Sequence, residues 1–182
     1  RGVRLDATVA STDDLALAAE EVGYPLAIKP TTGSKGEGVH TGINSWDELQ
    51  KTYAHVVHSL RPREILIETS VVGDDYRILV LGDRVLAACR RIPANVVGNG
   101  RNTIAQLIEA KNDTRRANPF LSRGLIAVDF EVQNLLDQLG YTLSSVLPEG
   151  QTVALRRVAN ASAGGDVLDV TAEIPQSLRD AA

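Results

Sequence analysis

The sequence has no methionine, a single cysteine and no long apolar run. With Cys89 alone, an intrachain disulfide is excluded, and a reducing compartment such as the cytoplasm is expected. No apolar run reaches the roughly 20 residues that a membrane-spanning helix needs, and no signal peptide is visible. Because the chain starts at Arg1 and lacks methionine, we expect it to be a piece of a longer cytoplasmic protein.

The composition is that of an ordinary globular protein. The chain has 182 residues, of which 43% are hydrophobic and 23% charged, so it can form one domain or two small ones. Its net charge of −4 argues against general binding to nucleic acids or membrane surfaces. Arginine pairs at 90–91, 115–116 and 156–157 could still line a positive pocket.

A short apolar segment near the N-terminus ends in a lysine and is followed by a glycine-rich turn. Pro30 biases Lys29 toward an extended backbone, which predicts a strand over 25–29. The turn contains Gly33, Ser34, Lys35, Gly36 and Gly38. Its glycines let backbone N–H groups approach an anion, and two lysines flank it. The stretch favours polyphosphate binding, with an ordinary glycine-rich hairpin as the alternative.

Two other phosphate-binding loops do not fit this stretch. A Walker A loop ends in Gly-Lys-Ser/Thr and opens a helix, whereas residues 36–39 read Gly-Glu-Gly-Val. A protein kinase has its glycine loop before the strand lysine, but here Lys29 comes first. The sequence also lacks the His-Arg-Asp and Asp-Phe-Gly tripeptides of kinases.

A second stretch resembles a purine-binding segment. An apolar strand carries Glu68 near its end, and after an irregular segment acids resume at Asp74 and Asp75. The carboxylate of Glu68 can accept the exocyclic amine of a purine, while the backbone of residues 69–71 can read the ring edge. The alternative is an exposed strand end followed by two acids in a turn.

Capping and periodicity predict the secondary structure. Helices are expected at 11–22, 45–58, 103–112 and 129–139, and another begins near residue 175. Strands are expected at 25–29, 39–43, 64–69, 75–81, 84–90 and 152–157, and residues 1–10 are expected to form a strand or a connector. Residues 113–127 are expected to form a loop or lid, and residues 160–166 another loop. The order of elements predicts an antiparallel α+β lobe.

These features together resemble the ATP-grasp family over nearly the whole chain. The strand lysine, glycine hairpin, strand-end glutamate and the Gly-Asp-Asp-Tyr-Arg run at 73–77 occur in that family's order. Residues 90–104 and 155–171 are similar to the ATP-grasp domain of cyanophycin synthetases. The insertion and the Ser-x-Gly-Gly-Asp loop at 162–166 also occur in the fused glutamate–cysteine ligase/glutathione synthetases.

The resemblance implies an α+β, ATP-grasp fold with ATP between two α+β lobes, truncated at the C-terminus. It divides the chain into a nucleotide-binding lobe at 1–91, an insertion and helical connector at 92–150, and the start of the second lobe at 151–182. It implies an ATP-dependent carboxylate–amine ligase that acts through an acyl phosphate, with cyanophycin synthesis favoured. A glutathione-type peptide ligase and a non-catalytic nucleotide-binding module are the alternatives.

The resemblance also implies roles for single residues that bind ATP. Lys29 would contact the α- and β-phosphates, and the glycine loop with Gly33, Ser34, Lys35, Gly36 and Gly38 would cover the triphosphate. Glu68, Thr69 and Val71 would contact the adenine, and Asp75 the ribose.

Arg91, Arg156 and Asn160 would face the transferred phosphate or the acyl phosphate. Such groups suit phosphoryl transfer, which depends on positioning and on absorbing charge. Ala163 departs from the family, where threonine is usual. The pair Arg115 and Arg116 is either a solvated loop face or, as the resemblance implies, close to the substrate.

The expected cofactors are ATP and Mg²⁺, and the expected partners are amino-acid or peptide substrates, with no nucleic acid and no membrane. The resemblance places the Mg²⁺ ligands beyond Ala182, so no residue is assigned to metal, including Asp166, Asp169 and Glu173. The 182-residue chain alone is therefore expected not to turn over ATP. Homo-oligomers of the full-length protein remain open.

Overall fold

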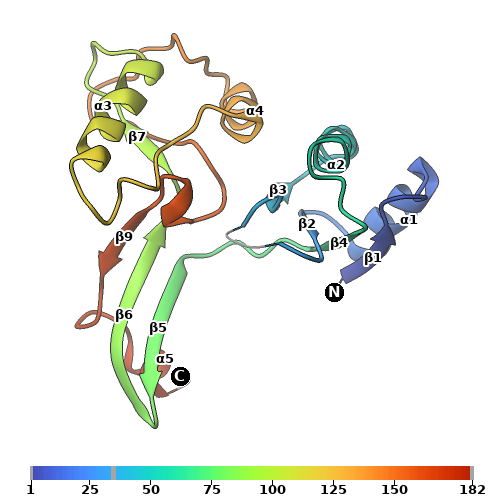
Figure 1. Cartoon of the computed structure of the whole chain (residues 1–182), viewed down its shortest axis with the longest axis horizontal. Helices are drawn as coiled ribbons and strands as arrows, with labels where there is room; N and C mark the ends of the chain where they lie inside the picture. The colour runs from blue at the N-terminus through green and yellow to red at the C-terminus, as the bar shows by residue number, and fades with distance from the viewer. Residues whose placement is uncertain (1, 34–35, 181–182) are drawn as a thin grey trace. The chain divides into compact units, whose positions relative to one another are not determined.

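The computed structural model of the protein describes residues 2–33 and 36–180, with Asp180 described by its backbone only (Figure 1). The chain forms two compact units, Arg1–Gly73 and Asp74–Ala182. The three-part division at residues 91 and 150 stays a prediction.

The first unit is a four-stranded antiparallel sheet with two helices packed against it. The strands are β1 (Gly2–Asp6), β2 (Leu26–Pro30), β3 (His40–Ile43) and β4 (Glu64–Thr69), in the order β1-β4-β2-β3. The helices are α1 (Thr12–Val22) and α2 (Trp46–Leu60), which contact each other and the sheet. All six elements agree with the sequence-based expectations to within two residues, except for β1, where a strand or connector was equally expected.

Caps set the ends of both helices in this unit. Ser11 and Asp14 form a capping box at the start of α1, and Gly23, with a φ of 80°, follows its last residue. Ser45 accepts a hydrogen bond from the N–H of Glu48 at the start of α2. The core between helices and sheet includes Leu15, Ile28, Leu49, Val56, Ile65 and Ile67, all 2% exposed or less.

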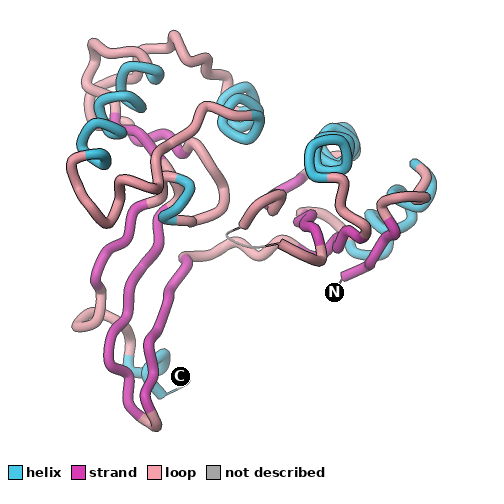
Figure 2. The backbone as a smooth tube through the Cα atoms, viewed as in Figure 1, coloured by secondary structure: helices cyan, strands magenta, loops and turns pink. Residues whose placement is uncertain are grey.

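The second unit contains two small antiparallel sheets and a helical part (Figure 2). The larger sheet joins β5 (Asp75–Leu81), β6 (Arg84–Ile92) and β9 (Asp166–Asp169), and the smaller joins β7 (Asn95–Val97) and β8 (Thr152–Ala154). The helices are α3 (Ile104–Arg116), α4 (Phe130–Gln138), α5 (Gln176–Asp180) and the 3-10 turn η1 (Ala161–Ala163). Ile104, Ile108, Val132, Leu136, Leu147 and Leu155 belong to its main core.

Some bounds in this unit differ from those expected from the sequence. The third helix continues to Arg116, so the expected loop at 113–127 begins four residues later, and the burial of Arg115 excludes the solvated loop face as its alternative. The strand at 152–157 ends at Ala154. The two strands β7 and β9 were not expected, because both are short and β9 is largely exposed. The turn η1 lies inside the loop expected at 160–166.

None of the helices in the described part of the chain is long and apolar enough to cross a membrane.

Candidate functional site

Strand alternation places Lys29 and Glu68 on the same face of the first sheet. On β4, Ile65 and Ile67 are buried against the helices, so Glu68 points to the opposite face. The register pairs Ala27 with Glu68, which puts Lys29 two residues along the neighbouring strand on that same face. The sheet face away from the helices therefore carries a cation and an anion side by side.

The two side chains form a direct ion pair. The Nζ of Lys29 donates to the Oε1 of Glu68 at 2.6 Å, and the side chains are 35% and 33% exposed. The sequence placed these residues at different ends of a nucleotide, but the structure brings them into contact. A pair this exposed contributes about 0–1 kcal/mol, so either partner can be exchanged for a ligand group at small cost.

The glycine loop follows directly after Lys29 and Pro30. Gly33, Gly36 and Gly38 have φ angles of 141°, 77° and 70°, which only glycine adopts without strain. A Cβ at Gly38 would lie 2.5 Å from the Cδ1 of Leu60, so the far end of the loop approaches α2 closely. Ser34 and Lys35, which we expected to contact phosphate, lie outside the described residues.

The segment after β4 begins with a buried, hydrogen-bonded residue, Ser70, and continues with an exposed one, Val71. Ser70 is buried, its N–H donates to the carbonyl of Pro25 at 2.8 Å, and its Oγ accepts from the N–H of Gly42 at 3.0 Å. Thr69 pairs with Leu26 at the end of β4, whereas Val71 is 89% exposed. The sequence analysis missed Ser70, whose signal was a small polar residue at the end of an apolar strand.

In the second unit, Asp75 and Arg91 face each other across β5 and β6. The Nε and Nη2 of Arg91 donate to the two carboxylate oxygens of Asp75, both at 2.8 Å. This bidentate contact raises the pKa of Arg91. Two residues expected at the ribose and at a phosphate are thus each other's partners.

Arg156 is buried between two carboxylates. Its Nη2 donates to Asp129, the N-cap of α4, and its Nη1 to Glu131 in the first turn of that helix. Burial raises the pKa of Glu131, as does the charge of Asp129, while the guanidinium of Arg156 opposes both effects. The Nε of Arg156 is a buried donor without a partner in the described ranges. Arg156 therefore fastens the start of α4.

Asn160 lies at the start of a closed loop. Its Oδ1 accepts from the N–H and Oγ of Ser162 at 3.0 and 2.8 Å, which caps η1. Its backbone carbonyl accepts from the N–H groups of Ala163 and Gly165 at 3.0 and 2.9 Å. Ala163, the position where the family usually has threonine, is the last residue of η1.

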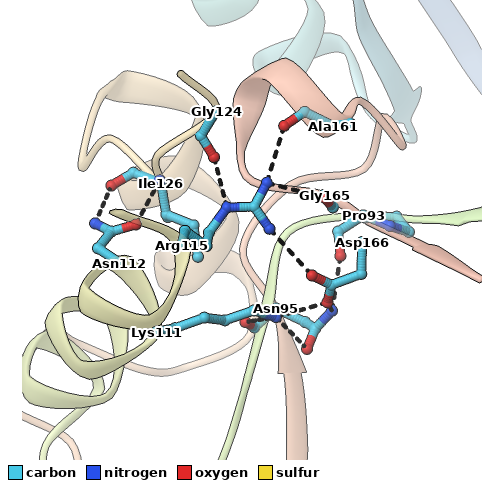
Figure 3. A network of polar contacts seen from close by, with 10 residues as sticks. All are labelled: Pro93, Asn95, Lys111, Asn112, Arg115, Gly124, Ile126, Ala161, Gly165 and Asp166. Atoms are coloured by element: carbon cyan, nitrogen blue, oxygen red, sulfur yellow. Dashed lines mark hydrogen bonds and ion pairs between the residues drawn. The ribbon is translucent and has the colours of Figure 1, made fainter. Parts of the chain in front are cut away.

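A polar network beside this loop was missed by the sequence analysis. Figure 3 shows Arg115, Lys111 and Asn112 of α3 reaching toward Asp166 and the surrounding backbone. The available signal was spacing, because Asn112 and Arg115 continue the buried helical face of Ile104 and Ile108. Because both residues are polar, their spacing did not suggest that they belong to a buried face.

The described residues contain no cluster of side chains that could by itself hold a metal ion. Across residues 2–33 and 36–180 there is no group of three or more histidine, cysteine or acidic side chains that could hold a metal. Asp166 accepts from Lys111 and Arg115, and Asp169 accepts from Thr171. The expectation that no residue of this chain is a metal ligand stays a prediction.

Comparison with known proteins finds relatives that match nearly the whole chain. Cyanophycin synthetase of Trichormus variabilis is 42% identical over 165 residues, covering 89% of this chain and 18% of the relative. The bifunctional glutathione biosynthesis protein GshAB of Mannheimia succiniciproducens is 35% identical over 169 residues, covering 88% and 22%. The chain spans about a fifth of the length of these relatives. No family model matches it.

Among solved structures, a bifunctional glutathione synthetase from Pasteurella multocida covers the whole chain. Its sequence identity is 30% and its TM-score 0.53, and the match takes up 24% of that protein. The resemblance inferred from the sequence and the expected α+β fold are both confirmed. The chain therefore has an ATP-grasp fold and corresponds to a segment found in both cyanophycin synthetases and bifunctional glutathione synthetases.

Proposed function

We propose that this chain is the nucleotide-binding and phosphate-facing part of an ATP-dependent carboxylate–amine ligase. The observation that carries the proposal is the contact of Lys29 with Glu68 on the sheet face away from the helices, on the strand that leads into the glycine loop. A lysine followed along the chain by glycine N–H groups suits phosphate oxygens, and the neighbouring carboxylate suits the amine of adenine. The relatives, a cyanophycin synthetase and a glutathione biosynthesis protein by name, support the same reaction class.

In the proposed reaction, a carboxylate oxygen of the substrate attacks the γ-phosphorus of ATP, and ADP leaves. The nitrogen of the amine then attacks the acyl carbon, the amine loses a proton and phosphate leaves. When ATP binds, Lys29 exchanges Glu68 for phosphate oxygens, and Glu68 becomes free to accept from the adenine amine. The 33–38 loop, with Thr69 and Val71, completes the contacts to the nucleotide.

The roles in the second unit are part of the same proposal. Arg91 would turn from Asp75 toward the transferred phosphate, which leaves Asp75 free to bind ribose hydroxyls. Asn160 would present its side-chain amide to the acyl phosphate. For Arg156 the contacts support a different role: both terminal nitrogens are taken by carboxylates, so it acts by holding α4 in place.

For the substrates we favour cyanophycin synthesis, in which arginine or aspartate is added to a polymer of these two amino acids. The cyanophycin synthetases compared are 35% to 42% identical to this chain, and the GshAB proteins 35% to 36%, so the higher identities belong to the first group. A glutathione-type ligase is the second candidate, because the solved structure that covers the whole chain is a bifunctional glutathione synthetase.

The test is ADP release by the full-length protein with ATP, Mg²⁺ and paired carboxylate and amine substrates. We expect release that requires both substrates, is lost in Lys29→Ala and persists in Lys51→Ala, a control on the exposed side of α2. Release with an aspartate/arginine polymer but not with γ-glutamylcysteine and glycine would select cyanophycin synthesis. Nucleotide binding without any release would support the non-catalytic alternative.

A further inference from the structure

The guanidinium of Arg115 is enclosed by two irregular segments of the second unit. Arg115 is 2% exposed, and its Nε donates to the carbonyl of Gly124 at 2.6 Å (Figure 3). Its Nη2 donates to the carbonyls of Ala161 and Gly165, at 3.0 and 3.2 Å. A single nitrogen thus contacts both ends of the loop that follows Asn160.

Asp166 compensates the buried charge and links it to the larger sheet. Its Oδ1 accepts from the Nη1 of Arg115 at 3.1 Å, and its Oδ2 accepts from the Nζ of Lys111 at 2.7 Å. Asp166 begins β9, where it pairs with Ile92 of β6, next to Arg91. The ion pair therefore joins the Asn160 loop to the strand that carries Arg91.

Close backbone packing makes this arrangement stiff. A Cβ at Gly124 would lie 2.2 Å from the carbonyl oxygen of Ala161, and one at Gly165 would lie 2.7 Å from the carbonyl oxygen of Ile92. Asn112 adds two hydrogen bonds to the backbone of Ile126, at 2.8 and 3.0 Å. A displacement of Arg115 would thus be passed directly to the backbone that positions Asn160.

We propose that Arg115 is a positioning residue, which holds the 160–165 loop so that Asn160 faces the acyl phosphate in a fixed geometry. This inference rests on the proposed ligase function. Four of the five N–H groups of the guanidinium fork can reach the three carbonyls and the carboxylate at once, as a lysine ammonium cannot. Replacement of the guanidinium by a lysine ammonium would keep the positive charge but remove hydrogen bonds that hold the 160–165 loop.

The test compares Arg115→Lys with Arg84→Lys in the full-length protein. Arg84 is the exposed first residue of β6 and has no role in the proposed site, so it is the matched control. The readout is the ratio of amide product to ADP. A lower folded fraction reduces both products equally, whereas a misplaced Asn160 lets water intercept the acyl phosphate and lowers the ratio.

We expect Arg115→Lys to lower the ratio at least twofold and Arg84→Lys to leave it at the wild-type value. An unchanged ratio in Arg115→Lys overturns the positioning role, whatever happens to kcat. If that variant does not fold, Asp166→Asn, which keeps the shape of the side chain, decides by the same ratio. Absence of substrate-dependent ADP release in the wild type would instead contradict the proposed function.

Discussion

Lys29 and Glu68 contact each other in the structure, and we propose that each contacts the nucleotide when ATP binds. Their strands are far apart in the sequence, and the side chains that meet are 39 residues apart. Sequence patterns indicated both strands and both functional side chains. The contact itself depends on the register between β2 and β4, which is set by tertiary packing and is not visible in either strand alone.

The Lys29→Ala substitution tests the phosphate contact. It removes a charge-assisted hydrogen bond of about 1.5–3 kcal/mol, so we expect ATP to bind roughly 10- to 150-fold more weakly, while adenosine binding changes little. Titration calorimetry of the full-length protein with a nonhydrolysable ATP analogue and with adenosine measures both. Lys51→Ala is the control, and equal losses for both ligands would remove Lys29 from the phosphates.

Glu131 gives the protein a pH-dependent stability. Burial raises its pKa above the ordinary value of 4.5 in the folded state, so the folded chain holds this proton more tightly than the unfolded chain. Its contribution to stability is therefore full below pH 4.5 and is lost as the pH rises through the raised pKa. In Glu131→Gln this titration is absent.

We accordingly expect the unfolding free energy of wild type minus that of Glu131→Gln to fall as the pH rises above 4.5. Urea unfolding of both chains at several pH values measures the difference. A difference that grows with pH would mean that Arg156 lowers the pKa of Glu131 by more than burial raises it.

At the scale of elements, capping residues were the most dependable guide. The starts of α1, α2, α3 and α4 all follow from a polar N-cap, as expected. The C-terminal end of a helix was harder to predict where its buried face carries polar residues. The helix α3 continues four residues past its expected end, because Arg115 is buried by partners from distant loops. The strand β9 is defined only by its pairing with β6.

The cap of α3 offers a direct measurement at this scale. Thr103 and Gln106 form a capping box, so Thr103→Ala should lower the unfolding free energy by about 1 kcal/mol. Thr114→Ala is the control, because Thr114 donates only to the carbonyl of Ala110 within the exposed part of the same helix; we expect a change within about 0.5 kcal/mol. Equal changes in urea unfolding would mean that the cap does not stabilise the helix.

For the whole molecule, the α+β class and the ATP-grasp resemblance were predictable, because both depend on the order of motifs along the chain. The side chains that contact the expected catalytic residues could not be predicted from the sequence. Arg91 and Arg156 each bind carboxylates, and those acids lie 16 to 27 residues away in sequence. Such pairings need the fold, since the sequence shows the charges without their neighbours.

If ATP activates a carboxylate as an acyl phosphate, one oxygen of that carboxylate must leave with the phosphate. The full-length protein would be given ATP, an amine and a substrate with oxygen-18 at both carboxylate oxygens, and the released phosphate would be analysed by mass spectrometry. We expect one labelled oxygen in each phosphate formed together with amide product. Unlabelled phosphate, or AMP and pyrophosphate in place of ADP and phosphate, would contradict it.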